Sequence, residues 1–147
     1  MTARTHRARF VQVMRALGHI DGQYYRVRRN LGIKESLFVL LYALSDGEPR
    51  SQKDICEEWF LPRTTLNTTV KEQEAAGHVE LVAGPGKLKL VMLTDSGRAY
   101  AEQLLGPLLD AEETVSSAVI DEPLVAALEA FGERLEAELA FLDRADA

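Results

Sequence analysis

The side chains best suited to specific chemistry lie in a polar stretch that follows Pro62. Four threonines and an asparagine form helices poorly, yet Leu66 and Val70 keep helical spacing there. With those two facing a core, the exposed set would be Arg63, Thr64, Thr65, Asn67, Thr68 and Lys71. Arginine and asparagine can each pair with a purine edge, a threonine methyl can contact thymine, and hydroxyls can bind phosphate. The pattern predicts a helix that contacts DNA; the alternative is a helix whose threonines only cap it or cover its surface.

Two further basic groups could contact the phosphate backbone beside that helix. Lys87 and Lys89 are two residues apart, so on a strand they would share one face. The alternative is a charged strand edge that prevents sheet aggregation. The second group, Ser51, Gln52 and Lys53, would begin an upstream helix, and Arg50 is a similar candidate. Arg4, Arg7 and Arg9 form either a basic arm or a solvated terminus.

The remaining reactive side chains do not form a catalytic or metal-binding pattern. The single cysteine, Cys56, excludes an intramolecular disulfide and is expected to be a small core residue rather than a redox switch. The three histidines have no ligand spacing, and no nucleophile is paired with a base. We expect no cofactor, no metal and no enzymatic activity. An aromatic group, Tyr24, Tyr25, Phe38 and Tyr42, would form either a pocket for a small-molecule effector or part of the core.

The elements that must position these residues can be inferred from hydrophobic period and end signals. Helical spacing predicts a long helix over 5–31, short helices over 34–45 and from Ser51, and the polar helix over 62–76. Period-two alternation on both sides of Gly84-Pro85-Gly86 predicts a hairpin, with Leu88, Leu90 and Met92 alternating with Lys87, Lys89 and Val91. Further helices should begin at Thr94 and Asp121. Three helices followed by a two-stranded wing form a winged helix-turn-helix.

Charge is distributed unevenly along the 147 residues, whose formal net charge is -6. Residues 1–100 carry 15 basic and 11 acidic side chains, whereas residues 101–147 carry 2 and 12. The acidic total therefore does not exclude a nucleic-acid partner for the first part. The longest apolar run, 36–45, is about half of a membrane span. We expect a cytoplasmic protein with no membrane partner.

The long flanking helices carry apolar stripes that a small winged helix cannot cover. One stripe runs from Phe10 to Leu31 and another from Leu124 to Leu142, both at helical spacing. A second copy of the chain, related by two-fold symmetry, would cover them economically. We therefore expect a homodimer.

Four stretches, in their order and spacing, resemble the MarR family of bacterial transcriptional regulators. They are residues 51–57, 63–70, 74–79 and 89–98, and the resemblance covers about Leu37 to Leu105. It implies a homodimer with a helical interface, two DNA-binding lobes, and repression that a small ligand or an oxidant relieves. The sequence departs from the family at Phe60, where many members have glycine, and at Gln73, where leucine is usual. The wing tip also lacks the family's acidic and arginine residues.

The sequence thus predicts a mainly α fold with a β wing: a winged helix-turn-helix with long N- and C-terminal dimerisation helices. We expect a single MarR-like domain over 1–147, with a DNA-binding lobe over 32–97 and helical dimerisation regions over 1–31 and 98–147. The predicted function is a sequence-specific transcriptional regulator, a ligand- or stress-responsive repressor that binds a pseudo-palindromic operator as a homodimer. The alternative is a winged-helix adaptor that has lost DNA binding and contacts other proteins.

Overall fold

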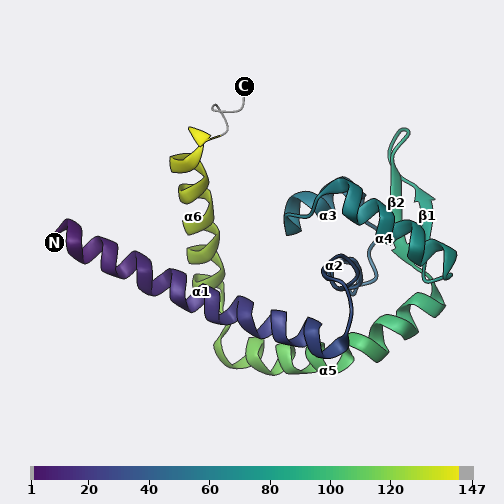
Figure 1. Cartoon of the computed structure of the whole chain (residues 1–147), viewed down its shortest axis with the longest axis horizontal. Helices are drawn as coiled ribbons and strands as arrows, with labels where there is room; N and C mark the ends of the chain where they lie inside the picture. The colour runs from purple at the N-terminus through teal and green to yellow at the C-terminus, as the bar shows by residue number, and fades with distance from the viewer. Residues whose placement is uncertain (1, 143–147) are drawn as a thin grey trace. The chain divides into compact units, whose positions relative to one another are not determined.

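The structure is a computed structural model that describes residues 2–142, and the chain divides into two compact units after Leu105. Six helices and two strands follow in the predicted order (Figure 1). They are α1 (Ala3–Leu31), α2 (Glu35–Ala43), α3 (Gln52–Trp59), α4 (Arg63–Ala75), β1 (Val79–Ala83), β2 (Lys89–Leu93), α5 (Asp95–Val119) and α6 (Glu122–Leu139). The predicted fold class is confirmed. The last five residues of the predicted region 98–147 lie outside the described part.

The hydrophobic core of the first unit is built around α2, which is buried along almost its whole length. Figure 1 shows α2 nearly end-on, in the middle of the winged lobe. Fully buried aliphatic side chains meet there from several elements: Leu40, Leu41 and Leu44, Ile55, Leu66 and Val70, Val91 and Leu105. Burying each such side chain contributes roughly 1.5–3 kcal/mol. This core holds α3, α4 and the wing in fixed places.

Helix α4 has one buried face that carries a polar bond as well as apolar side chains. Leu66, Thr69 and Val70 are its buried residues. The Thr69 hydroxyl forms a 2.7 Å hydrogen bond with the Ser36 hydroxyl of α2, so neither buried group is left without a partner. Gly77 follows the helix at φ 78°, a left-handed conformation that glycine adopts without strain. Because only Leu66, Thr69 and Val70 are buried, the other faces of α4 are left to solvent.

The junction between the wing and α5 is tightly packed. Thr94 caps α5 as predicted, because its Oγ1 accepts the Gly97 N–H at 3.0 Å and donates to the Gly77 carbonyl at 2.6 Å. A Cβ at Gly97 would lie 1.7 Å from the His78 carbonyl oxygen. The His78 ring in turn stacks on Tyr100 with a centroid distance of 4.1 Å. Only glycine allows the start of α5 to approach the start of β1 this closely.

The wing is an antiparallel hairpin with Val79 opposite Leu93 and Ala83 opposite Lys89. Its second strand buries Val91 and Leu93. The side chains that the sequence indicated as the apolar face of this strand, Leu88, Leu90 and Met92, are therefore not the buried ones. The strand reads as a continuous apolar run from Leu90 to Leu93, and such a run does not reveal which face is buried. Backbone pairing decides it: Arg50 forms a β-bridge with Val91, with N–O distances of 3.0 and 2.8 Å.

Helices α1 and α6 contrast with the lobe, since neither has a buried residue in the described chain. Val13, Met14 and Ile20 on α1 are exposed large apolar side chains, as are Leu124, Val125 and Leu128 on α6. The end signals that were predicted for α6 are present, because the Asp121 carboxylate accepts the Leu124 N–H at 2.9 Å. None of the helices in residues 2–142 combines the length and apolarity that a membrane crossing needs.

Candidate nucleic-acid interface

The polar face of α4 is open to solvent. The outermost stripe consists of Thr64, Thr68 and Lys71, which are exposed and spaced by four and three residues. Arg63 and Thr65 are also exposed, and Asn67 on the flank is half-buried. The Thr68 hydroxyl donates to the Thr64 carbonyl at 3.0 Å, which leaves its oxygen free to accept. All six side chains predicted on this helix are thus present at the surface of the lobe.

Ion pairing separates the basic side chains of the lobe into two sets. Residues 32–97 carry seven basic and ten acidic side chains, so the lobe has no general positive charge. Three of its cations form ion pairs: Lys34 with Glu72 at 2.6 Å, Arg50 with Asp46, and Lys53 with Glu57 at 3.8 Å. Within residues 2–142, no ion pair involves Arg63, Lys71, Lys87 or Lys89. The four cations without a carboxylate partner therefore all lie on α4 and the wing.

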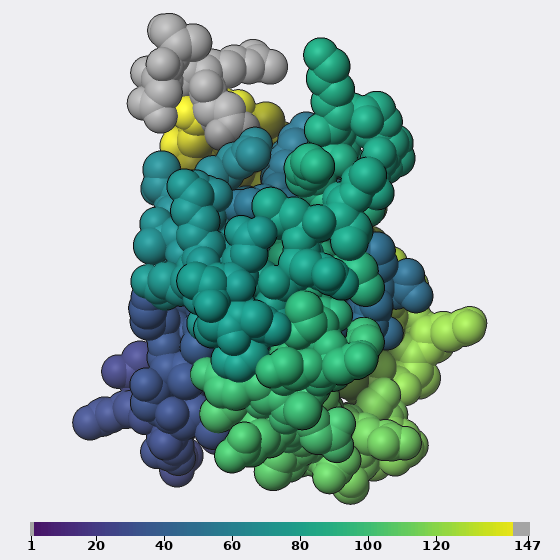
Figure 2. Space-filling view, turned by 90° about the vertical axis from the view of Figure 1, so that its right-hand side faces the viewer, coloured from purple at the N-terminus to yellow at the C-terminus, as the bar shows by residue number. Residues whose placement is uncertain are grey.

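Figure 2 shows the face of the lobe on which α4 and the wing lie together, in teal and blue-green. Lys89 begins β2, but Lys87 lies in the turn over residues 85–88, which is closed by a 3.2 Å bond from the Leu88 N–H to the Pro85 carbonyl. The prediction that the two lysines share one face of a strand was therefore wrong. The turn is longer than the sequence suggested because Gly86 adopts a φ of 63° and Pro85 has no N–H to donate. Both lysines remain exposed.

The start of α3 is less available than the sequence suggested. Ser51 is only 3% exposed, and its hydroxyl accepts the Asp54 N–H at 3.0 Å, so the predicted cap also removes this hydroxyl from the surface. Arg50 is held by the Asp46 carboxylate, with one N–O distance of 2.7 Å, and this guanidinium lowers the pKa of Asp46 to about 2. Gln52 is half-buried, and Lys53 is exposed. Ser51 and Arg50 are therefore not among the exposed contact groups.

One exposed residue, three positions before Arg63, was not in the predicted set. Phe60 ends α3 in a left-handed conformation, with φ 53° and ψ 45°, and its side chain is 93% exposed. It is the only residue other than glycine with positive φ in residues 2–142. The replacement of the family's usual glycine was the signal in the sequence that could have pointed to it.

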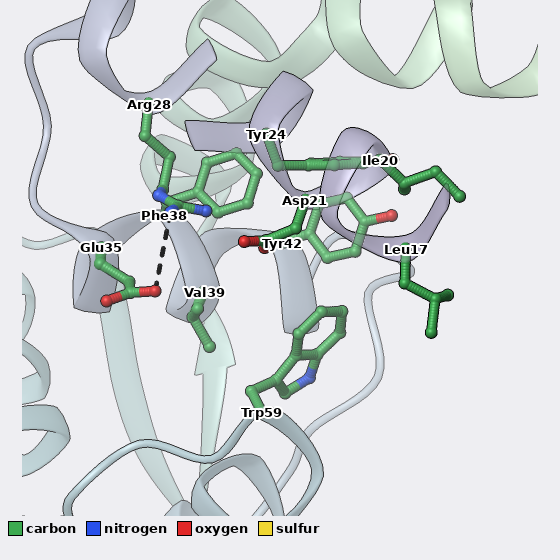
Figure 3. A pocket seen from close by; sticks show the side chains of 10 residues that line it. All are labelled: Leu17, Ile20, Asp21, Tyr24, Arg28, Glu35, Phe38, Val39, Tyr42 and Trp59. Carbon is green, nitrogen blue, oxygen red and sulfur yellow. Dashed lines mark ion pairs between the residues drawn. The ribbon is translucent and has the colours of Figure 1, made fainter. Parts of the chain in front are cut away.

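An aromatic pocket is lined by α1, α2 and the end of α3 (Figure 3). Its volume is about 390 Å³. Four rings follow one another along its wall: Tyr24 and Phe38 at 6.4 Å, Phe38 and Tyr42 at 5.6 Å, and Tyr42 and Trp59 at 5.2 Å between centroids. Tyr25 does not line it and is 56% exposed, because the next residue of a helix points about 100° away.

The polar groups at the pocket come from α1 and α2. Asp21, Arg28 and Glu35 line it, and Arg28 lies 3.7 Å from Glu35, as the dashed line in Figure 3 shows. The Arg28 guanidinium also lies 5.7 Å from the Phe38 ring centroid, within the range of a cation–π contact. The pocket therefore combines apolar walls with one cation and two carboxylates.

Cys56 and the histidines form no reactive centre in the described residues. Cys56 is buried, and burial raises the pKa of its thiol, which disfavours the reactive thiolate. His78 is engaged by Gln73, whose Oε1 lies 2.8 Å from its Nδ1. No group of three or more His, Cys, Asp or Glu that could hold a metal occurs in residues 2–142.

Comparison with known proteins connects this geometry to a family. Residues 31–87 match a model of the MarR family. The chain is similar to a MarR family regulator from Neisseria meningitidis, with 26% identity and a TM-score of 0.75 over 90% of this chain and 96% of that one. It also resembles the transcriptional regulator BldR from Sulfolobus solfataricus, with 21% identity and a TM-score of 0.62 over 91% and 99% of the two chains.

A third structure, NadR in complex with 4-hydroxyphenylacetate, shares 14% identity and a TM-score of 0.62 over 85% of this chain and 89% of its own. No curated protein matches the chain. The resemblance inferred from the sequence is confirmed: residues 31–87 match a MarR family model, and the winged helix-turn-helix is similar to that of a MarR family regulator.

Proposed function

We propose that the protein is a sequence-specific DNA-binding regulator that acts as a homodimer and places one α4 in the major groove of each half-site. The observation that carries this proposal is the distribution of free cations, since Arg63, Lys71, Lys87 and Lys89 lack carboxylate partners among the described residues. The other basic side chains of the lobe are neutralised by carboxylates, whereas those on this face are not. This face therefore provides a local site for phosphates. Thr64, Thr68 and Asn67 supply side chains short enough to reach base edges between those cations.

The proposed contact set is smaller than the sequence alone suggested. It consists of six residues on α4, Arg63, Thr64, Thr65, Asn67, Thr68 and Lys71, with Lys87 and Lys89 on the wing and Gln52 and Lys53 at the start of α3. Ser51 is left out because its hydroxyl is buried in the helix cap. Phosphate contacts would orient the lobe, and Arg63 and Asn67 would read purine edges.

Selection of bound fragments from a random duplex library tests this proposal. The wild-type protein should select a pseudo-palindrome with half-sites about 34 Å apart. Arg63→Ala with Lys71→Ala should abolish selection and make the dependence of affinity on salt shallower by about 1 for each cation removed. Lys34→Ala with Arg134→Ala removes two exposed cations that already have carboxylate partners, so this control should select the same sequence. Failure of the wild-type protein to select any duplex would contradict the proposal.

The homodimer is supported by α1 and α6, since neither helix has a fully buried residue in the described part of a single chain. Helices of 29 and 18 residues gain most of their stability from packing rather than from intrinsic propensity. Their exposed apolar side chains, which include Ile20, Leu124 and Leu128, would be covered by a second copy with two-fold symmetry. Regions 1–31 and 98–142 would then form the dimerisation part, and 32–97 the DNA-binding lobe.

The aromatic pocket supports ligand control of this regulator. NadR was crystallised with 4-hydroxyphenylacetate, and a small aromatic acid is a reasonable first probe for a pocket that has aromatic walls and an arginine. A ligand that binds one spacing of the two lobes more tightly would shift the population away from the DNA-bound form, which is how repression would be relieved. Trp59 is the single tryptophan and lines the pocket, so its fluorescence reports on that site alone.

Adjacent tyrosines provide the matched test of the pocket. Tyr24 lines it and Tyr25 does not. Titration with 4-hydroxyphenylacetate should change Trp59 fluorescence in the wild type and in Tyr25→Ala, and should fail to do so in Tyr24→Ala. Equal responses in the two variants would show that the probe binds elsewhere.

A specific observation keeps a second candidate, a protein–protein adaptor, in view. Helix α3 exposes Asp54, Glu57 and Glu58, and carboxylates repel a phosphate backbone. An adaptor would retain its partner after Arg63 and Lys71 are replaced by alanine, whereas a DNA reader would lose its operator. The same pair of variants therefore separates the two functions.

A further inference from the structure

Phe60 occupies a backbone conformation that its side chain disfavours. At φ 53° and ψ 45° a Cβ crowds the following carbonyl oxygen, which is why this conformation usually belongs to glycine. The residue is kept there by the end of α3, where its N–H donates to the Cys56 carbonyl. Residues held in such conformations often mark functional sites. The bulky side chain is therefore a feature that the local fold does not require.

The Phe60 ring does not contribute to the core either. It is 93% exposed, whereas the preceding Trp59 packs edge-on against Tyr42 and the following Leu61 is half-buried. Gly32, Gly47, Gly77 and Gly86 occupy the other positive-φ positions among the described residues. Glycine at position 60 would relieve the backbone and remove an exposed apolar ring. Folding alone therefore gives no reason for phenylalanine at this position.

The place of Phe60 in the chain points to the surface that the ring serves. It lies three residues before Arg63, and Pro62 is extended, with φ -62° and ψ 137°, directly ahead of α4. The N-terminal end of a recognition helix is the part that reaches base edges in the major groove. Of the acidic groups on α3, Glu57 is paired with Lys53 at 3.8 Å, whereas Asp54 and Glu58 are exposed.

We propose that Phe60 is a specificity-determining residue that contacts the C5 methyl group of a thymine in the major groove. A phenyl ring has no hydrogen-bonding group, and the thymine methyl is the apolar group that base pairs present in that groove. This inference rests on the proposed DNA-binding function and adds to it a preference for one base. Phe60 lies three residues before Arg63, so its ring would add an apolar contact to the hydrogen-bonding contacts proposed for α4.

Replacement of thymine by deoxyuridine tests the contact, because the two bases differ only by the methyl group. The probe is the duplex selected by the wild-type protein, with each thymine replaced in turn by deoxyuridine. For wild type, replacing the contacted thymine of a single half-site should weaken binding about fourfold, the effect of losing one buried methyl group. Phe60→Gly should bind the two duplexes equally, and Phe60→Leu, which keeps an apolar side chain, should regain part of the preference.

Stability provides a second readout with the opposite sign. Phe60→Gly should melt at a higher temperature than wild type because glycine adopts positive φ freely, so weaker binding could not be attributed to misfolding. A lower melting temperature would overturn the argument from strain.

Two binding results would also overturn the proposed contact. In the first, deoxyuridine replacement weakens the binding of Phe60→Gly by the same factor as the binding of wild type. In the second, Phe60→Gly binds both the thymine and the deoxyuridine duplex more weakly than wild type by one common factor, which would place the ring on the sugar-phosphate backbone. If wild type selects DNA but either result is found, the regulator assignment stands and only the thymine contact fails. If wild type selects no DNA, both fail together.

Discussion

The winged lobe and the two flanking helices α1 and α6 are stabilised in different ways. In the lobe, α2, α3, α4, β2 and the first turns of α5 share a core whose central side chains are fully buried. Helices α1 and α6 have end signals and apolar stripes but no buried residue in the described chain. The lobe carries its own core, whereas the two helices expose apolar side chains that the proposed second copy would cover. Substitutions in the two regions should therefore differ in kind as well as in size.

The largest difference should come from adding one methyl group to a glycine in each region. Gly97→Ala places Cβ 1.7 Å from the His78 carbonyl oxygen, and the backbone of the junction must move, so we expect a loss of more than about 3 kcal/mol. Gly18→Ala has nothing within 4 Å in the single chain and should gain about 0.5–1 kcal/mol from helix propensity. Thermal or urea unfolding of both variants measures this. A destabilised Gly18→Ala dimer would show that the partner chain packs closely at Gly18.

The next effect concerns assembly rather than folding of the lobe. Leu128 is 46% exposed on α6, and Leu128→Glu should shift the dimer toward monomer by placing a charge in an apolar interface. Light scattering coupled to size exclusion, at several protein concentrations, measures the change. Glu129→Gln, one residue away, is the control and should remain dimeric. A wild-type protein that is monomeric at every concentration would contradict the proposed role of these helices.

An effect of intermediate size should come from the buried polar bond inside the lobe. Thr69→Val leaves the Ser36 hydroxyl buried without its 2.7 Å partner, and we expect a loss of about 1–3 kcal/mol. Ser36→Ala combined with Thr69→Val removes both polar groups and should recover much of that loss. Urea unfolding of the single and double variants gives the coupling energy. Additive losses would mean that the bond itself contributes little.

The smallest effect should come from the ion pair that precedes α3. Arg50 lowers the pKa of Asp46 to about 2 from an ordinary value of 3.8, so the carboxylate stabilises the folded state above about pH 4. This contribution is lost as the pH falls through about 2. Because Asp46 is half exposed, Asp46→Asn should cost only about 0.5–1 kcal/mol at neutral pH.

The difference between wild type and Asp46→Asn should shrink on acidification and vanish near pH 2. Melting temperatures measured from pH 7 down to pH 2 test this dependence. Glu48→Gln removes a nearby charge without removing the bond to Arg50 and serves as the control. A difference between wild type and Asp46→Asn that stayed constant down to pH 2 would contradict the shifted pKa.

The order of elements could be predicted because its signals are local. The caps at Ser51, Thr94 and Asp121 each involve a backbone N–H three residues further on, and hydrophobic period is read within a few turns. The fold class follows from that order. The buried face of β2 could not be predicted in the same way, because Val91 is paired with Arg50, which is 41 residues away in the sequence.

The candidate interface was predictable in its residues but not in its electrostatics. The polar face of α4 follows directly from the spacing of Leu66 and Val70. The pairing of Lys34 with Glu72 joins residues 38 positions apart, and no sequence pattern shows which cations are neutralised by such contacts. Phe60 was visible as a departure from the family, but its strain and exposure depend on the backbone conformation at the end of α3.

The bridge between Arg50 and Val91 has a mechanical consequence. It fastens the segment that leads into α3 to the middle of β2, and the buried Val91 side chain anchors that strand in the core. The hairpin therefore cannot swing as an independent finger about its own base. A displacement of the residues ahead of α3 would therefore move the strand as well, so in the proposed DNA complex the hairpin and the helices would tilt together.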